Sequence, residues 1–543
     1  MRRSSYISSI ILIAIVLVVI VLNVLAHCCV LRYDMTEDKR YTISETTKHL
    51  VRSLDEPMIM TLYLDGQLNA GFMRLRKATL ELGEDIHACQ SLFAVQTAKP
   101  DSTLIRYGLS PTLVHERSQD GRTIQTQVFP YVSLTYHGRT TYVPLLHNNR
   151  GKMGEQNLNE SIEDLEYAMA ESIYLLTRHQ TQKIAFIEGH NELPERSVYD
   201  ISATLSRYFQ IDRGVIGNDP TMLNDYRVVI IADPQTPFSE TDKYVLDQYI
   251  MRGGRVLWLI NGVRFSKENL SSNGYTPVIP LDLHLADMLF TYGIRINPTL
   301  VQDVQCLPIP VDVSADPSQP NYQPLPWYYA PLLLTSQQSP ITRNVGQVSA
   351  TFVSHVDAVG NDSIQKEILL ATSTASRVIG TPTEVDLGDI NPDMSLFQWQ
   401  FVPVSVALSG SFTSAFHHRM PPEGMAAHEQ QSHSVPTKQI VVASGSVIRN
   451  EWQQGPLPVG YDRYSGMVFG NRDFLTNAVL YLADDDGLIM LRQKSIALRL
   501  LNDRRAHEKR YIIQVVSIIS PIALLALTGC FVMLIRKRKY IRL

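Results

Sequence analysis

An apolar run long enough to cross a bilayer stands near each end of this sequence. The first covers Tyr6 to Ala26, and the second covers Tyr511 to Ile535. About 20 mainly apolar residues are enough for a helix to span the hydrocarbon core of a membrane. We therefore predict an N-terminal transmembrane anchor within residues 1–33, and a C-terminal transmembrane helix with a basic tail within residues 504–543.

Two other interpretations of the first run stay open. Arg2 and Arg3 followed by an apolar stretch are also typical of a cleavable signal peptide, and Cys28 could end a lipoprotein signal. We favour an uncleaved anchor, because the run is long for a signal peptide. In addition, Ala26-His27-Cys28 places a bulky histidine where a small residue belongs.

The positive charges next to the two runs predict the orientation. Residues 536–539 are all Lys or Arg and follow the second run, while Arg2 and Arg3 precede the first. The positive-inside rule then places both termini in the cytoplasm and the bulk of the chain in the periplasm, attached to the inner membrane. Basic residues at 504, 505, 509 and 510 argue against this orientation, but long translocated domains follow the rule weakly.

The segment between the two runs has the composition of an ordinary folded protein. The chain has 543 residues, with 45% hydrophobic and 19% charged residues and a net charge of −4, which does not indicate a nucleic-acid partner. Among the five cysteines, Cys89 and Cys306 form the only conceivable disulfide of the soluble body, and no cysteine spacing indicates zinc or redox chemistry.

Residues 34–155 are predicted to form an N-terminal α+β periplasmic domain. A helix start at Ser44, a strand at 58–64, a helix, and a hairpin turning at 136–139 follow one another. This order suits a domain of thioredoxin-like or ferredoxin-like size. The absence of a C-x-x-C sequence excludes thioredoxin chemistry.

Residues 156–503 are predicted to form an α/β domain that opens with a linking helix at 159–179. Apolar strands at 184–187, 228–232 and 255–260 alternate with helices, two of which begin with an S-x-x-D signal at Ser197 and Ser239. This alternation predicts parallel strands with helices on both faces. The proline-rich segment 305–331 is predicted to be an irregular loop. Further strands are expected at 365–373, 402–409, 440–444, 467–469 and 495–500, with a helix at 474–482.

Common catalytic motifs are missing from the sequence. His428 and His433 are five residues apart, whereas the zinc-protease motif needs a spacing of four, and prolines flank this stretch. The sequence contains no P-loop, no G-x-G-x-x-G after a strand and no G-x-S-x-G nucleophile elbow. We therefore predict no catalytic residues, no metal site and no cofactor.

Polar side chains follow the predicted parallel strands, where ligands bind in sheets of this kind. Glu188, His190 and Glu192 follow one strand, Asp233 ends the next, and Asn261 ends the third. These five residues are the candidate ligand-binding residues. The alternative is a solvated loop in which Gly189 only permits a tight turn.

Several ordered stretches resemble one family. They are "LRYDMTEDKRY" from Leu31, "NESIEDLEY" from Asn159, "KIAFIEGHNE" from Lys183, "LADMLFTYGIRINPTLVQD" from Leu285, "SGSFTSAF" from Ser409 and "GNRDFLTNAVLYLADDDGLIMLRQK" from Gly470. Together they resemble the gliding-motility-associated auxiliary subunit of an ABC transporter, the GldG type of the Bacteroidetes. The resemblance covers nearly the whole chain.

The resemblance implies a core similar to the class I glutamine-amidotransferase fold, but no cysteine here fits that family's nucleophile. It also implies partnership with a separate permease and a separate ATPase in systems linked to gliding or cell-surface secretion. We expect a non-catalytic, substrate-binding-like subunit with an unknown small-molecule ligand. The alternatives are a periplasmic hydrolase or amidotransferase-like enzyme using Glu188, His190 and Asp233, and a true solute-binding protein.

Overall fold

The computed structural model describes residues 14, 17, 42–66, 68–100, 103–117, 123–146, 154–178, 181–312, 314, 321–360, 363–389, 392–425, 430–484, 489 and 509–541. They fall into two units, one within residues 1–495 and one within 496–543, and each is described by itself. Most of the predicted N-terminal anchor, His428 and the strand predicted at 495–500 lie outside the described residues.

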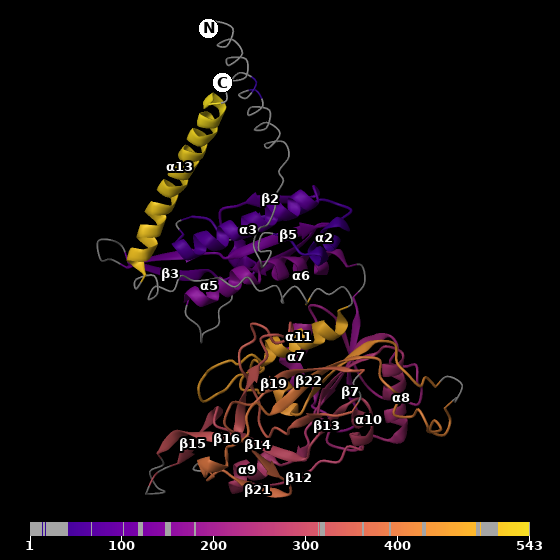
Figure 1. The fold of residues 1–543 in the computed structure, drawn as a ribbon. Coiled ribbons are helices and arrows are strands. Elements are labelled where there is room, and N and C mark those ends of the chain that lie inside the picture. Colours follow the sequence, from indigo (N-terminus) through magenta and orange to yellow (C-terminus); the bar gives the residue numbers. More distant parts are fainter. Residues whose placement is uncertain are drawn as a thin grey trace. The chain divides into compact units, whose positions relative to one another are not determined.

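The N-terminal part is built on a four-stranded sheet with the order β2-β1-β5-β6 (Figure 1). Strands β1 and β2 are parallel and are connected through helix α3, while β5 and β6 form the predicted hairpin around His137 and Gly138. The elements are α2 (Glu45–Arg52), β1 (Met58–Leu62), α3 (Ala70–Cys89), β2 (Phe93–Thr97), α4 (Thr103–Arg106), β3 (Thr112–Arg117), β4 (Thr123–Val128), β5 (Tyr131–Tyr136) and β6 (Arg139–Pro144).

The predicted linking helix is present but divided. It consists of α5 (Gly154–Glu163) and α6 (Leu165–Thr177), which meet at Asp164. The Asp164 N–H still donates to the carbonyl of Glu160 at 3.0 Å, and the Asp164 carbonyl accepts from Ala168 at 2.9 Å. The interruption is therefore local and does not turn the chain away from a helical path.

A ten-stranded sheet forms the centre of the larger part, in the order β15-β16-β19-β22-β23-β10-β9-β7-β8, with β17 (Val348–Ser349) paired to β16. Its parallel half confirms the sequence prediction and consists of β7 (Lys183–Glu188), β8 (Gln210–Val215), β9 (Tyr226–Ala232), β10 (Arg255–Leu259) and β23 (Thr437–Val442). Strands β19 (Gln365–Ala371) and β22 (Pro403–Gly410) extend it in antiparallel fashion.

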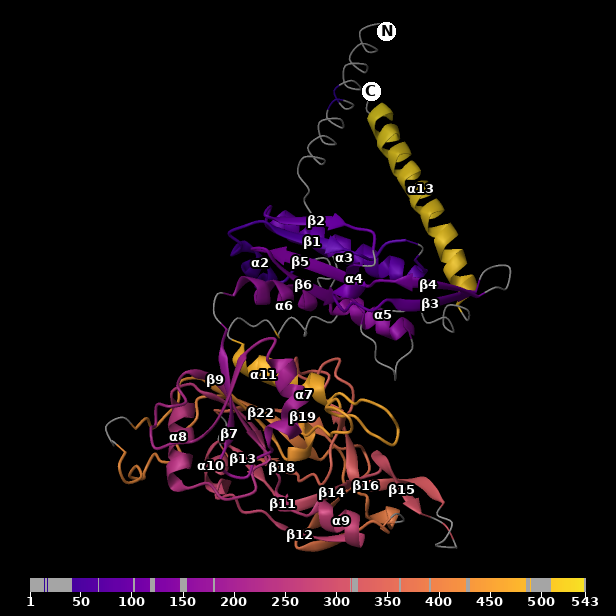
Figure 2. The same cartoon turned by 180° about the vertical axis from the view of Figure 1, so that it is seen from behind.

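Helices cover both faces of this sheet, as Figures 1 and 2 show. Alternate residues of each strand point to opposite faces. Ile230 and Leu257 pack in the cluster that contains α7 (Tyr199–Leu205) and α11 (Asn471–Ala483). Val229 and Trp258 pack in the cluster that contains α8 (Glu240–Met251) and α10 (Ala286–Thr291). The described chain is thus a mixed α/β protein.

The prediction of an irregular proline-rich loop is wrong. Residues 305–331 contribute strands β15 (Cys306–Asp312) and most of β16 (Tyr322–Thr335), which pair in antiparallel fashion. Pro308 lies opposite Pro326 and Pro310 opposite Pro324. Proline is tolerated in edge strands and near bulges, and β15 is the last strand of the sheet with a register shift after Cys306.

The two S-x-x-D signals have different outcomes. Ser239 and Asp242 form the complete capping box of α8. Ser197 instead lies in a short 3-10 helix (Glu195–Val198), and the Asp200 carboxylate binds Arg472 at 2.6 Å and 2.9 Å. The strand predicted at 467–469 is also wrong, because Val468 forms only an isolated bridge with Tyr461.

Small sheets and one helix form an additional layer near the ends of the parallel strands. Trp327, Phe352, Leu300 and Val385 belong to the separate apolar cluster of this layer. Its elements are β11 (Val263–Arg264), α9 (Lys267–Asn273), β12 (Tyr275–Pro280), β14 (Thr299–Asp303), β20 (Ser376–Gly380) and β21 (Thr383–Asp386). Strands β13 (Ile294–Ile296) and β18 (Val356–Ala358) pair with each other, and their residues Ile294 and Val356 pack in the cluster of α8 and α10.

The second unit contains helix α13 (Arg510–Ile541). Its segment Gln514–Ile535 is long and apolar enough to cross a membrane. This is the one such segment among the described residues. It coincides with the predicted C-terminal transmembrane helix, and Pro521 lies inside it.

Candidate ligand-binding crevice

The order of the parallel strands creates a crevice at their carboxyl ends. After β7 the chain forms β8 on one side of it, and then β9 on the other side. The loops that follow β7 and β9 therefore leave the sheet in opposite directions, which is where doubly wound sheets bind ligands. The candidate residues from the sequence come from these loops and from the end of β10.

Asp233 and Asn261 are brought together at the floor of this crevice. The Asn261 side-chain amide donates to Asp233 Oδ1 at 2.6 Å, and the Asn261 side-chain oxygen accepts the Gly445 N–H at 2.8 Å. Asp233 and Asn261 are only 5% and 4% exposed. Asn261 thus joins the ends of β9, β10 and β23, so both side chains have a clear structural role.

Gly445 is required by this close packing. A Cβ atom at residue 445 would lie 2.3 Å from the Asp233 carboxyl carbon, which is far inside van der Waals contact. Asp233 itself has a positive φ of 58°, an uncommon conformation for a residue with a side chain. The backbone is therefore strained at the point where the three strand ends meet.

The cations Arg449 and Lys267 act on the Asp233 carboxylate. Arg449 Nη2 is 3.3 Å from Asp233 Oδ2. The neutral Gln235 amide donates to Asp233 Oδ1 at 2.8 Å. Burial raises the pKa of the Asp233 carboxyl group, and the positive charges of Arg449 and Lys267 only partly offset this effect. Desolvation by the surrounding protein and the Arg449 charge lower the pKa of Lys267.

His190 is held in place by carboxylates on both sides. Its Nδ1 lies 3.0 Å from Glu192 Oε1, its Nε2 lies 3.3 Å from Asp242 Oδ2, and its ring stacks on Phe238 at 3.6 Å between centroids. Burial alone lowers the pKa of His190, but the hydrogen bonds and charges of Glu192 and Asp242 outweigh it and raise the pKa. Both ring nitrogens are therefore engaged in fixing the loop after β7.

The structure separates Glu188 from the other candidates. Its carboxylate accepts from Arg213 Nε of β8 at 2.7 Å, and Arg213 also lies over the Phe186 ring. Glu192 is almost fully covered and accepts the His190 N–H at 2.6 Å. Of the five predicted site residues, only Asp233 and Asn261 line the crevice directly.

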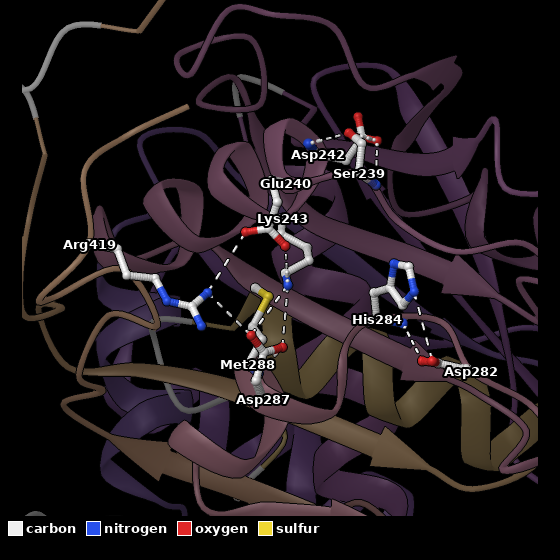
Figure 3. Close-up of polar contacts among 9 residues, drawn as sticks. All are labelled: Ser239, Glu240, Asp242, Lys243, Asp282, His284, Asp287, Met288 and Arg419. Carbon is white, nitrogen blue, oxygen red and sulfur yellow. Dashed lines mark hydrogen bonds and ion pairs between the residues drawn. The ribbon is translucent and has the colours of Figure 1, made fainter. Parts of the chain in front are cut away.

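The N-terminus of α8 explains why Asp242 is available to His190. Figure 3 shows Asp242 next to Ser239, whose hydroxyl donates to Asp242 Oδ2 at 2.5 Å. The next residue, Lys243, contacts Glu240 at 2.7 Å and Asp287 of α10 at 3.3 Å, and Arg419 reaches the same two carboxylates. These ion pairs fix α8, α10 and the segment after β22 beside one another.

Two neighbouring cavities open at this edge of the sheet. The smaller cavity measures about 260 Å³ and is lined by Asp233, Asn261, Lys267 and Arg449, among others. The larger measures about 640 Å³ and shares Lys267, Ser446 and Arg449 with it. Known small-molecule pockets occupy roughly 300–1,000 Å³, so the larger cavity has the size of a ligand site.

Sequence reasoning missed several residues of this crevice. Lys267, Arg449 and Trp327 belong to segments that carry no motif, and each reaches the crevice from a distant part of the chain. The Ser444-Gly445-Ser446 triplet was recognisable only as a turn. A triplet of small residues directly after a buried parallel strand is the signal that could have placed Gly445 at this edge.

Comparison with known proteins identifies the larger part. The sequence profile of the "ABC-type uncharacterized transport system" family matches residues 181–478, more than half of the chain. The chain belongs to this family of ABC-transporter auxiliary proteins. Membership of this family supports a transport-associated protein. Together with α13, it also suggests association with a membrane.

Other similarities cover smaller or more distant regions. A domain of unknown function, DUF7088, matches residues 37–135 of this auxiliary-family protein. An uncharacterized protein of Borreliella burgdorferi is 22% identical over 280 residues, which is 50% of this chain and 52% of the relative, so the chain spans about half of that relative's length. The mmIFT52 N-terminal domain aligns over 56% of this chain and 98% of its own, with 15% identity. Its TM-score of 0.32 is too low to assign a shared fold.

Proposed function

We propose that this protein is a non-catalytic, membrane-anchored auxiliary subunit of an ABC transporter, with a substrate-binding-like body and a separate permease and ATPase as partners. The observation that carries the proposal is the auxiliary-family match over residues 181–478. The sequence resemblance to the GldG type supports a finer assignment to the Bacteroidetes systems linked to gliding motility or cell-surface secretion.

The proposed anchoring uses two helices with the body between them. Support comes from Gln514–Ile535 of α13 and from the apolar run Tyr6 to Ala26. The basic residues at 2–3 and 536–539 favour cytoplasmic termini and a periplasmic body. We also propose domain boundaries at residues 33, 155 and 503, with a thioredoxin- or ferredoxin-like first domain. The second domain is proposed to be glutamine-amidotransferase-like, and the order of its parallel strands supports this second assignment.

The geometry of the crevice favours binding over catalysis. A general base needs a nitrogen or oxygen free to reach the substrate, and both nitrogens of His190 face carboxylates. The Glu188 carboxylate points to Arg213. The enzyme alternative would need Glu188, His190 and Asp233 to face one substrate, and these three side chains do not converge. Burial raises the pKa of the Cys306 thiol to about 11, which keeps it protonated and poorly nucleophilic at neutral pH.

Purification of the intact membrane complex tests the proposed function. An affinity-tagged full-length chain should retain a permease and an ATPase, and a chain ending at residue 508 should lose the permease if α13 docks against it. Isolation of the full-length chain without any transporter subunit, under conditions that keep other inner-membrane complexes intact, contradicts the proposal.

A genetic test separates the subunit from an enzyme. His190→Gln should still complement a deletion strain if its folded body remains at the wild-type level. A substrate-turnover activity that disappears in a folded His190→Gln protein would establish the enzyme alternative instead.

A further inference from the structure

The larger cavity has one apolar side and one charged end. Leu270, Leu307, Ile309, Trp327, Phe352 and Leu387 form its apolar lining. Lys267 and Arg449 lie where it meets the smaller cavity. Apolar walls with a few convergent polar groups are typical of sites that bind a small molecule and fix its orientation.

The charged end contains a cation with no carboxylate of its own. Arg449 contacts Asp233, and Arg463 is paired with Glu451. For Lys267, the described part of the chain offers no hydrogen bond and no ion pair within 4.0 Å. An anion in the cavity would have access to Lys267, because this lysine is exposed and has no carboxylate partner among the residues that the structure describes, whereas Arg449 already contacts Asp233.

The cavity lining also contains polar atoms that lack partners. Trp327 is only 7% exposed, and its indole Nε1 has no hydrogen-bond acceptor among the described residues. The Thr351 hydroxyl is likewise buried without a partner in this part of the structure. Buried polar groups are nearly always hydrogen-bonded in folded proteins, so these two groups are exceptions in the cavity wall, and a small movement of the wall would open them to ligand oxygen atoms.

We infer that this cavity binds an amphipathic molecule with an anionic headgroup, a carboxylate or a phosphate ester, whose charge lies at Lys267 and Arg449 and whose apolar part lies along Trp327, Phe352 and Ile309. The inference extends the proposed function, since it names the ligand class of the auxiliary subunit. Charge at one end and apolar lining at the other distinguish this class from sugars and from free inorganic anions.

A quenching experiment on the full-length chain in nanodiscs of zwitterionic lipid tests the inference. Brominated decanoate should quench tryptophan fluorescence, and Trp327→Phe should remove most of that quenching, because the other three tryptophans do not line the cavity. Unlabelled decanoate or monodecyl phosphate should displace the probe, and the stronger of the two identifies the headgroup. Inorganic phosphate and butyrate should fail to displace it.

Charge selectivity is tested at Lys267. Wild-type protein should prefer decanoate over decanol and decyltrimethylammonium by about tenfold or more, as a charge-assisted hydrogen bond implies. Lys267→Met should reduce the decanoate affinity to that of decanol, and Lys267→Arg should restore the preference. Lys77→Met, at an exposed lysine of α3, is the matched control and should behave as wild type.

Equal affinities of the wild-type protein for decanoate and decanol would overturn the inference, as would quenching that persists in Trp327→Phe. Co-purification of permease and ATPase is measured on the same preparations. An intact complex without decanoate binding refutes the ligand class and leaves the proposed function standing. Selective decanoate binding by a chain that associates with no transporter subunit supports the ligand class and refutes the proposed function.

Discussion

Gly445 and Asp233 show how tightly single residues determine the crevice floor. The Gly445 backbone lies against the Asp233 carboxylate and donates its N–H to Asn261. Because a methyl group at residue 445 has no room, the strand-end cluster must shift to accept any side chain.

We expect Gly445→Ala to lower the free energy of unfolding by about 1–3 kcal/mol, the usual cost of overpacking. Gly214→Ala is the matched control, because a Cβ at residue 214 meets nothing within 4 Å. Thermal and denaturant unfolding of the two variants provide the comparison. Equal stabilities would show that the cluster relaxes without cost.

His190 predicts a pH dependence of stability. Its folded-state pKa is raised above the ordinary value of 6.5, so the folded protein binds the proton more strongly than the unfolded chain does. The stabilising contribution is complete below about pH 6.5 and is lost as the pH rises through the folded-state pKa. Replacing His190 should therefore remove stability mainly on the acidic side.

Denaturant unfolding at a series of pH values measures this effect. The wild-type free energy of unfolding should fall as the pH increases above about 6.5, and His190→Gln should flatten that part of the profile. His49→Gln, at an exposed histidine of α2, should leave the profile unchanged. A His190→Gln profile parallel to that of the wild type would refute the linkage.

At the scale of elements, Asp247 of α8 ties three segments together. Its buried carboxylate accepts hydrogen bonds from Tyr292 at 2.8 Å, from the Ser414 hydroxyl at 2.7 Å and from the Ala415 N–H at 2.8 Å. Tyr292 ends α10, and Ser414 and Ala415 follow β22. The polar stretch 409–416 is thus fixed to the helical layer by one acid.

Asp247→Ala should destabilise the protein by at least about 3 kcal/mol, because several buried donors lose their acceptor at once. Hydrogen exchange should accelerate at the Ala415 N–H more than in β9 or β10. Asp225→Ala, at an exposed acid, should change stability by less than about 0.5 kcal/mol. Slow exchange at Ala415 in the Asp247 variant would contradict this role.

The elements that the sequence predicted are those defined by local patterns. The parallel strands β7, β9 and β10 follow from continuous apolar runs, and the α8 capping box needs only Ser239 and Asp242. Ser197 and Asp200 have the same local pattern, but the Asp200 carboxylate pairs with Arg472, which lies 272 residues later in the sequence. The prolines of β15 and β16 are tolerated because of their register and edge position, which depend on the assembled sheet.

The sequence predicted the part of the candidate site that depends on strand order, but not the part that depends on contacts between distant segments. Topology alone places Asp233 and Asn261 at the strand ends, whereas the side-chain directions of Glu188, His190 and Glu192 depend on Arg213, Phe238 and Asp242. Lys267, Arg449 and Trp327 come from segments far apart in the chain. Without their spatial assembly, neither the cations nor the apolar lining could be assigned to one cavity.

For the whole molecule, the apolar runs predict how the chain is held at a membrane. A chain beginning at residue 34 should remain in the membrane fraction after alkaline carbonate extraction, since Gln514–Ile535 can span a bilayer. Two arginine substitutions, Leu524→Arg and Leu525→Arg, should release that shortened chain, because each central arginine costs about 2.5–3.5 kcal/mol on insertion.

A matched pair of substitutions on the exposed tail, Lys537→Arg and Arg538→Lys, should leave membrane attachment unchanged. The same arginine pair in the full-length chain tests the N-terminal run: retention in the membrane is expected if residues 1–33 also provide an anchor. Release of the shortened chain without any substitution would refute membrane insertion of α13.

The pairing of β10 with β23 has a consequence for biosynthesis. These neighbouring strands include Trp258 and Gln439, whose side chains are bonded although they are 181 residues apart in the sequence. Residues 437–442 must be synthesised before β23 can pair with β10. The apolar edge of β10 therefore stays exposed while the intervening residues are made. Non-local pairing of this kind slows folding and exposes the nascent chain to aggregation. This body should therefore depend strongly on chaperones that shield its half-built sheet.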